Sequence, residues 1–214
     1  MINEVAEQFA AFGVVPVVEI KDEAWALPLA DALIAGGLPV AEITFRTAAA
    51  EGVIRTLARE RPQLLIGAGT VLTAENLERA LAAGAKFAVA PGLNSEIVRA
   101  AQAAGLPFLP GVATPSDIER GLSLGCRLLK FFPAEALGGV KLLKAFSGPY
   151  RHMGVRFMPT GGINPDNLRD YLRIPVVAAA GGTWIARAED MEAGNWDAIA
   201  DRCRAACRLA ADRT

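Results

Sequence analysis

Short apolar runs alternate with longer mixed stretches along the whole chain. The runs are rich in Val, Ile and Phe, which is typical of strands, and the stretches between them are rich in Ala, Leu, Glu and Arg, which favours helices. Most runs are continuously apolar, as parallel strands buried on both faces are. The predicted strands are Val14–Ile20, Val40–Phe45, Leu64–Ala68, Phe87–Ala90, Pro107–Leu109, Arg127–Phe132, Arg156–Pro159 and Val176–Ala180. The predicted helices are residues 2–12, Ala24–Ala35, Ala48–Arg59, Ala74–Ala83, Ser95–Ala104, Pro115–Leu124, Val140–Phe146, Asn164–Tyr171 and Asn195–Ala211.

A weak internal repeat supports this alternation. A glycine follows the end of a helical stretch and precedes a strand at Gly37, Gly84, Gly105 and Gly125, and the last three lie 21 and 20 residues apart. Glycine commonly ends a helix. One strand–helix unit per 20–25 residues predicts an α/β fold, a (β/α)8 TIM barrel with a short N-terminal helix, as a single domain over residues 1–214.

The alternative fold is an open doubly wound sheet. That fold more often carries a glycine-rich turn directly after its first strand. Here Pro16 lies inside the first strand and Lys21-Asp22 follow it, which favours the barrel.

Composition and charge exclude several functions. Of the 214 residues, 52% are hydrophobic and 21% are charged, which predicts a folded domain with a sizeable core. The net charge of −1 argues against nucleic acid as the main partner. No apolar stretch approaches the roughly 18 residues of a membrane helix. The N-terminus lacks the pattern of a signal peptide, so we expect a cytoplasmic protein.

The few cysteines and the single histidine narrow the chemistry. Cys126, Cys203 and Cys207 are too few for a disulfide framework and fit a reducing compartment. Cys203 and Cys207 share a helix face and could bind metal, but packing is the favoured interpretation because no third ligand is near in sequence. His152 lies in a predicted surface turn, and one histidine cannot form a His-rich metal site. We therefore expect carboxylates, lysines, arginines and hydroxyls to carry the chemistry.

Two charged residues lie inside predicted apolar strands. Lys130 is in Leu-Leu-Lys-Phe-Phe and Glu42 is in Val-Ala-Glu-Ile-Thr, each five residues after the glycine that precedes its strand. In a barrel these residues of the second and sixth strands face one another across the mouth. A buried lysine is disfavoured in its charged form, and a neutral amine attacks a carbonyl to form a Schiff base. The alternative is an internal salt bridge with a structural role.

Further polar residues and glycines lie at predicted strand ends. Arg46 follows the second strand and suits a carboxylate or a phosphate, Thr70 ends the third, and Pro91 ends the fourth. Taken singly, Arg46 could be a surface arginine, Thr70 a helix N-cap and Pro91 part of a turn. Glycine pairs in Thr160-Gly161-Gly162 and Gly181-Gly182-Thr183 end the seventh and eighth strands, where barrels commonly bind phosphate, although both could simply be tight turns.

Two long motifs resemble the signatures of one enzyme family. Gly37-Leu-Pro-Val-Ala-Glu-Ile-Thr-Phe-Arg46 and Gly125-Cys-Arg-Leu-Leu-Lys-Phe-Phe-Pro-Ala-Glu-Ala-Leu-Gly138 are similar to those of the 2-keto-3-deoxy-6-phosphogluconate (KDPG) and 4-hydroxy-2-oxoglutarate aldolases. Shorter matches in the same order extend the similarity over nearly the whole chain.

The resemblance implies a class I aldolase, a homotrimeric (β/α)8 barrel without a metal or another cofactor, that acts on a small phosphorylated keto acid. From the charge and the short apolar runs, we expect neither nucleic acid nor a membrane as a partner. By position it makes Lys130 the imine-forming lysine and Glu42 the general acid and base. It assigns Arg46, Thr70 and Pro91 to the keto-acid end of the substrate, and Thr160, Gly161, Gly162, Gly182 and Thr183 to the phosphate end.

Two positions depart from the family pattern. Thr183 stands where several relatives have Ser, but it keeps the hydroxyl. Glu19 stands where an apolar or neutral residue is expected, and a carboxylate there is unfavourable near the phosphate end unless Lys21 offsets it.

Two other functions remain open. A phosphate-binding barrel isomerase or synthase would use the glycine loops without a Schiff base, and a non-enzymatic sugar-phosphate-binding barrel would bind its ligand without cleaving it.

Overall fold

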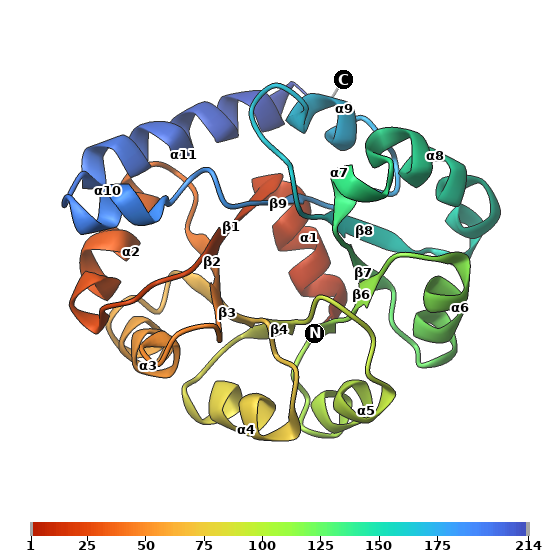
Figure 1. The fold of residues 1–214 in the computed structure, drawn as a ribbon, viewed down its shortest axis with the longest axis horizontal. Helices are drawn as coiled ribbons and strands as arrows, with labels where there is room; N and C mark the ends of the chain where they lie inside the picture. The colour runs from red at the N-terminus through yellow and green to blue at the C-terminus, as the bar shows by residue number, and fades with distance from the viewer. Residues whose placement is uncertain (1, 213–214) are drawn as a thin grey trace.

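The computed structural model describes residues 2–212, in which parallel strands curl around a central axis (Figure 1). The helices lie outside the strands, except that α1 lies across the middle of the strand ring in this view. This confirms the predicted α/β class. The strands are β1 (Val14–Val18), β2 (Val40–Thr44), β3 (Leu65–Gly69), β4 (Phe87–Val89), β5 (Phe108–Leu109), β6 (Gly111–Val112), β7 (Leu128–Phe131), β8 (Arg156–Pro159) and β9 (Ala180–Gly182).

The strands form two curled parallel sheets. One sheet has six strands in the order β5-β4-β3-β2-β1-β9, and the other has three in the order β6-β7-β8. Pro110 alone separates β5 from β6, so these two segments lie on one stretch of chain. Parallel bridges from Phe157 to Val177 and from Thr160 to Gly181 connect β8 with the segment that leads into β9. The two sheets therefore meet at both of their edges.

The helices follow the strands at most of the predicted places. They are α1 (Ile2–Phe12), η1 (Glu23–Trp25), α2 (Ala26–Ala35), α3 (Ala50–Glu60), α4 (Ala74–Ala82), α5 (Ser95–Ala103), α6 (Pro115–Ser123), α7 (Ala134–Leu137), α8 (Gly139–Tyr150), η2 (Arg151–Met153), α9 (Leu168–Leu172), α10 (Ala188–Glu192) and α11 (Trp196–Ala211). The sequence analysis did not predict α7 or α10, which are only four and five residues long and too short to show a helical period.

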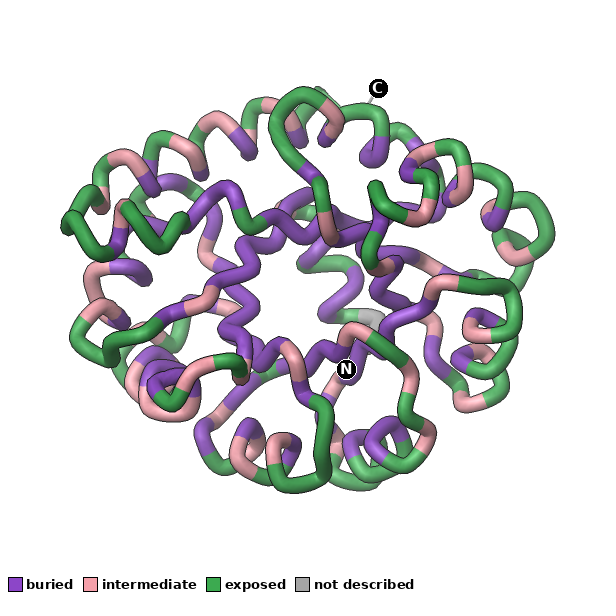
Figure 2. Tube along the Cα trace, viewed as in Figure 1, coloured by how far each residue is buried: buried purple, intermediate pink, exposed green. Residues whose placement is uncertain are grey.

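The core lies between the strands and the inner faces of the helices. Figure 2 shows buried chain along the strand ring and exposed chain on the outer helix surfaces. The α1 helix contacts both β1 and β7, and Phe9 on it packs edge-on against Phe87 of β4 with ring centroids 5.0 Å apart. This helix covers the end of the two curled sheets, together called the barrel below, at which the strands begin, so the opposite end is left for the loops that carry the site.

Two strand predictions needed correction. The eighth strand was predicted at Val176–Ala180, but β9 spans Ala180–Gly182, because its hydrogen-bond register with β1 pairs Val14 with Ala180 and Val15 with Gly181. The glycine pair thus lies inside the strand and not after it. The predicted strand Pro107–Leu109 also continues beyond Pro110 into β6.

The cysteines and the histidine lie where the sequence placed them. Cys203 of α11 is fully buried, and its partner Cys207 places Sγ 3.5 Å from the carbonyl oxygen of Gly37. Burial raises the pKa of the Cys203 thiol to about 12, which makes it an inert packing residue. His152 is exposed in η2.

The described residues contain neither a metal-binding cluster nor a membrane-spanning helix. Among the described side chains, no three His, Cys, Asp or Glu come together as a set that could hold a metal ion. In the described part of the chain, no helix has both the length and the apolar character needed to cross a membrane.

Replacement of Gly67 by Ala is expected to destabilise the fold. A Cβ atom at this position of β3 would lie 2.3 Å from the ring of Phe87, which is fully buried against Phe9 and has no space to move. We expect Gly67→Ala to lower the free energy of unfolding by about 2 kcal/mol in urea denaturation. The control is Gly148→Ala in α8, where a Cβ would meet nothing within 4 Å, and stability should rise by about 0.5–1 kcal/mol. Equal stability of the two variants would contradict this packing.

Candidate active site

A cavity of about 340 Å³ opens at the end of the barrel at which the strands finish. Barrel enzymes carry their active sites at this end. Every site residue predicted from the sequence lines the cavity except Gly162 and Gly182. The lining consists of Val17, Glu42, Thr44, Arg46, Thr70, Pro91, Lys130, Phe132, Thr160, Gly161 and Thr183.

Lys130 and Glu42 form a buried ion pair in this lining. The Nζ atom of Lys130 lies 3.1 Å from Oε1 and 3.4 Å from Oε2 of Glu42, and the side chains are only 6% and 0% exposed. Lys130 comes from β7 and Glu42 from β2, on opposite sides of the strand ring. The Nζ atom also lies 5.6 Å from the centroid of the Phe132 ring. The pair therefore places an amine, with a proton acceptor in contact, at an apolar wall of the cavity.

Glycines on the neighbouring strands make room for Glu42 and for the backbone of Pro91. A Cβ atom on Gly69 of β3 would lie 2.3 Å from Oε1 of Glu42, so a larger residue would displace the carboxylate. On the other side, Gly111 of β6 is the register partner of Lys130, and a Cβ there would lie 2.0 Å from the carbonyl oxygen of Pro91. The sequence analysis missed both glycines, because their role depends on which strands are neighbours.

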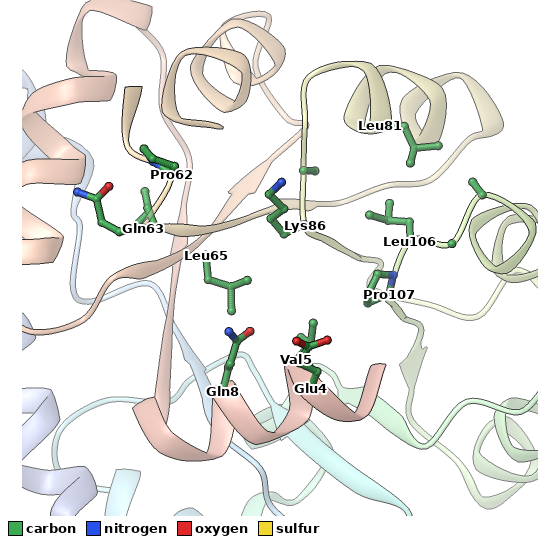
Figure 3. A pocket seen from close by; sticks show the side chains of 14 residues that line it. Glu4, Val5, Gln8, Pro62, Gln63, Leu65, Leu81, Lys86, Leu106 and Pro107 are labelled. Carbon is green, nitrogen blue, oxygen red and sulfur yellow. The ribbon is translucent and has the colours of Figure 1, made fainter. Parts of the chain in front are cut away.

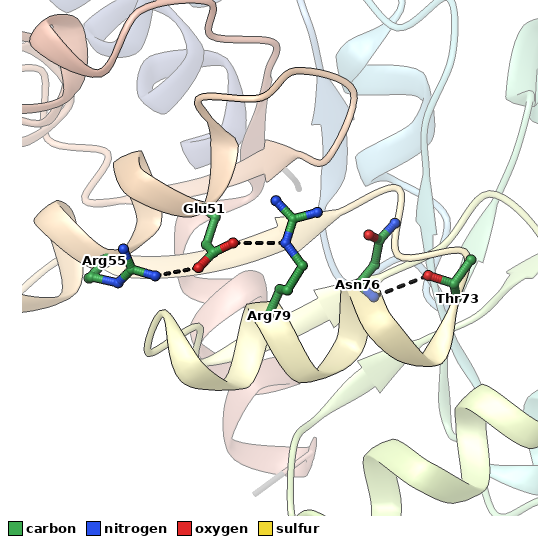
Figure 4. Close-up of polar contacts among 5 residues, drawn as sticks. All are labelled: Glu51, Arg55, Thr73, Asn76 and Arg79. Atoms are coloured by element: carbon green, nitrogen blue, oxygen red, sulfur yellow. Dashed lines mark hydrogen bonds and ion pairs between the residues drawn. The ribbon is translucent and has the colours of Figure 1, made fainter.

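The loop that carries Arg46 is fixed by contacts on its outer side. Phe45 lies beneath the guanidinium of Arg79 of α4, 5.3 Å from the ring centroid, and Arg79 in turn bonds to Glu51 of α3 at 2.7 Å (Figure 4). Arg55 also donates to Glu51. The hydrogen bond from Arg79 is the main cause that lowers the pKa of Glu51. These contacts join α3 and α4 to Phe45, the residue next to Arg46, which lines the cavity.

Thr70 has a strained backbone. Its φ angle is +57°, a left-handed conformation that β-branched residues rarely adopt. The alternative role as a helix cap is wrong, because Thr73 caps α4 by accepting a hydrogen bond from the amide of Asn76 at 3.1 Å (Figure 4). Strain of this kind is concentrated at functional sites, and here it holds a hydroxyl-bearing residue in the cavity lining.

The opposite side of the cavity is formed by the ends of β8 and β9. Thr160 is buried, and Gly161 and Thr183 complete this side. Neither glycine pair leads directly into a helix, because α9 begins at Leu168 and α10 at Ala188. The glycine loops therefore do not place a helix N-terminus directly at the cavity.

Close packing explains why glycine stands at the two positions outside the lining. Gly162 has a φ of +81°, and a Cβ there would lie 2.6 Å from Cβ of Glu135. A Cβ on Gly182 would lie 1.9 Å from the ring of Trp184. Glu135 accepts a hydrogen bond from the hydroxyl of Tyr171. Burial is the main cause that raises the pKa of this hydroxyl, and the bond to Glu135 raises it further.

A larger cavity of about 500 Å³ lies at the other end of the barrel (Figure 3). It lies between Gln8 on α1 and the segments around Leu65, Lys86 and Pro107, where β3, β4 and β5 begin. Because the paired charges and the strained Thr70 are absent from its lining, the smaller cavity is the candidate active site.

Comparison with known proteins agrees with this geometry. Residues 5–202 match the family model described as KDPG and KHG aldolase. The 2-dehydro-3-deoxy-phosphogluconate aldolase of Pseudoalteromonas atlantica is 47% identical over 95% of this chain and 94% of its own length. The KHG/KDPG aldolase of Escherichia coli is 46% identical over 90% of each chain. The chain belongs to the KDPG and KHG aldolase family.

A solved structure from the same family carries a covalent intermediate. The KDPG aldolase of Legionella pneumophila, with pyruvate captured at low pH as a covalent carbinolamine, superposes with a TM-score of 0.90. It is 46% identical and covers 94% of this chain and 96% of its own. A carbinolamine forms when an amine adds to a ketone, which is the chemistry that a buried lysine can supply.

Removing one member of the buried pair is expected to destabilise the protein strongly. Lys130→Met leaves the carboxylate of Glu42 buried without its partner, so the free energy of unfolding should fall by about 3 kcal/mol. The double variant Lys130→Met/Glu42→Gln removes both charges and should recover most of this loss. Urea denaturation of Lys130→Met, Glu42→Gln and the double variant measures the coupling free energy between the two charges. Additive losses would show that the two charges do not interact.

Thr70→Gly and Thr70→Ala separate backbone strain from the loss of the hydroxyl. Both variants lack the side-chain oxygen, but only glycine adopts a φ of +57° without strain. We expect the glycine variant to be more stable than the alanine variant by about 1 kcal/mol in urea denaturation. The opposite order would mean that residue 70 does not adopt a left-handed conformation.

Proposed function

We propose that this protein is a class I aldolase that cleaves KDPG to pyruvate and D-glyceraldehyde 3-phosphate through a Schiff base on Lys130. The observation that carries the proposal is the contact of 3.1 Å between a buried amine and a buried carboxylate in a cavity. The names of the relatives and the captured carbinolamine support it. The cavity of about 340 Å³ is in the size range of small-molecule sites.

The first steps form the imine. Lys130 passes its proton to Glu42 and attacks C2 of the substrate ketone as a neutral amine. Glu42 returns a proton to the carbinolamine oxygen, which leaves as water. The resulting protonated imine withdraws electrons from the neighbouring carbon atoms, so it acts as the electron sink for bond cleavage.

The next steps cleave the carbon–carbon bond. Glu42 takes the proton of the C4 hydroxyl, directly or through one water, and the bond between C3 and C4 breaks with its electron pair moving towards the imine. Glyceraldehyde 3-phosphate leaves, and an enamine remains on Lys130. The enamine takes a proton at C3, and hydrolysis of the imine releases pyruvate and restores the amine.

The remaining cavity residues bind the two ends of the substrate. Arg46 and Thr70 bind the keto-acid carboxylate, and Pro91 closes the wall beside them. Thr160, Gly161 and Thr183 face the phosphate end, with Gly162 and Gly182 supporting them from outside the cavity lining. Arg46 and Lys130 outnumber the one carboxylate of the lining, which favours an anionic substrate.

The same chemistry extends to a second substrate. 4-Hydroxy-2-oxoglutarate (KHG) has the same keto-acid end as KDPG and would yield pyruvate and glyoxylate. The description of the matching family model and the name of the Escherichia coli relative favour this second activity.

We also propose that the two curled sheets form one eight-stranded barrel, in which β5 and β6 count as a single strand. The bridges between β8 and the segment that ends in β9 support this closure. A homotrimeric assembly and a cytoplasmic location stay predictions from the sequence.

Borohydride trapping tests the Schiff base. Incubation with pyruvate and borohydride should add a reduced pyruvyl group to the peptide that contains Lys130, detected by mass spectrometry. EDTA should leave the labelling unchanged, because the protonated imine, and not a metal ion, withdraws electrons from the neighbouring carbon atoms. Lys130→Arg is the matched control: it keeps the positive charge, but a guanidinium does not lose its proton, so labelling and turnover should both disappear. An isomerase or synthase without a Schiff base would show no adduct.

A further inference from the structure

The loops after β1 and β2 bring a second carboxylate to Arg46. The Nη1 atom of Arg46 lies 3.2 Å from Oε2 of Glu19, and the two side chains are 48% and 42% exposed. Glu19 directly follows β1, and Arg46 lies two residues beyond the end of β2. Glu19, which departs from the family pattern, therefore contacts Arg46 at the keto-acid end of the cavity. The expectation that it lies near the phosphate end is wrong.

Two hydroxyl groups hold these loops in register on either side of the ion pair. Thr44 donates to the carbonyl oxygen of Val18 at 3.1 Å, and Thr47 donates to that of Ile20 at 2.5 Å. In the sequence, Glu19 lies between the residues that accept these bonds, Val18 and Ile20. Arg46 lies between the residues that donate them, Thr44 and Thr47. The backbone spacing of the pair is thus fixed by two bonds on partly or fully buried groups.

The nearest cation in sequence does not neutralise Glu19. Lys21 was expected to offset this carboxylate, but its Nζ atom lies 3.1 Å from Oε1 of Glu192 on α10. The charge of Glu19 therefore acts on Arg46.

We propose that Glu19 is an internal competitor for the carboxylate of the substrate. This inference rests on the proposed function, in which Arg46 binds the keto-acid end. An arriving carboxylate must either displace Glu19 from the guanidinium or bind beside it, and two adjacent carboxylates repel each other. Either way, Glu19 weakens binding of the keto acid and favours release of pyruvate. Because exposed ion pairs are weak, the effect is a moderate rise in KM and not a block.

Glu19→Gln tests this competition. The variant keeps the size of the side chain and removes its charge. We expect KM for KDPG, and the pyruvate concentration that gives half-maximal borohydride trapping, to fall about two- to five-fold, while kcat changes less than two-fold. A general structural disturbance would not lower KM. An unchanged KM would overturn the proposal, and a raised KM would show instead that Glu19 holds Arg46 in place for the substrate.

Glu192→Gln is the matched control. It removes the same charge from an ion pair of similar exposure, 57% and 51%, that joins the loop after β1 to the last residue of α10. Its KM and trapping curve should match those of the unchanged protein. An equal fall in KM for both variants would show an effect of net charge alone and would overturn the role of Glu19.

The same experiment separates this inference from the proposed function. If the unchanged protein forms no pyruvyl adduct on Lys130, the Schiff-base function fails. If the adduct forms and the half-saturating pyruvate concentration is the same with and without the charge of Glu19, only the competition fails.

Discussion

Two opposite charges lie side by side in the interior of this protein, and their mutual compensation constrains the structure around them. Lys130 and Glu42 come from strands on opposite sides of the barrel, and both are almost completely removed from water. Neither charge is tolerable there alone, because an unpaired buried ion loses its hydration without replacement. The strands must therefore bring the two side chains within 3.1 Å, and Gly69 must leave space for the carboxylate. In the proposed mechanism, the chemistry uses the contact that the fold needs.

Around this pair, contacts on the outer side of the cavity walls hold those walls in place. The stacking of Arg79 on Phe45 anchors the loop that carries Arg46, and the packing of Gly162 against Glu135 supports the β8 loop. The backbone of Thr70 stays in a costly left-handed conformation directly after the end of β3. The helix α1 covers the other end of the barrel, so stability and chemistry are assigned to opposite ends of the strands. Arg46 is held by the carboxylate of Glu19, which we propose the carboxylate of the substrate can replace.

Most of the strands and helices could be predicted because local pattern and burial agree along this chain. β8 was predicted with its observed bounds, and α3 to α6 differ from their predictions by at most two residues. The eighth strand was misplaced by several residues, because an apolar run reports burial, whereas hydrogen bonds to β1 decide where β9 lies. The helices α7 and α10 have only four and five residues, little more than one turn. Apolar positions therefore cannot recur along them often enough to show a helical period.

The sequence by itself determined the pair at the centre of the site: a lysine and a glutamate inside apolar strands are rare enough to indicate a paired role, and the spacing from the preceding glycines placed them in matching positions. Tertiary structure alone decided which groups stand beside them. Gly69, the left-handed Thr70 and the pairing of Glu19 with Arg46 all depend on residues brought together from different strands. No local pattern contains that information, because a side chain's neighbours across a barrel are set by strand register and loop path rather than by distance along the chain.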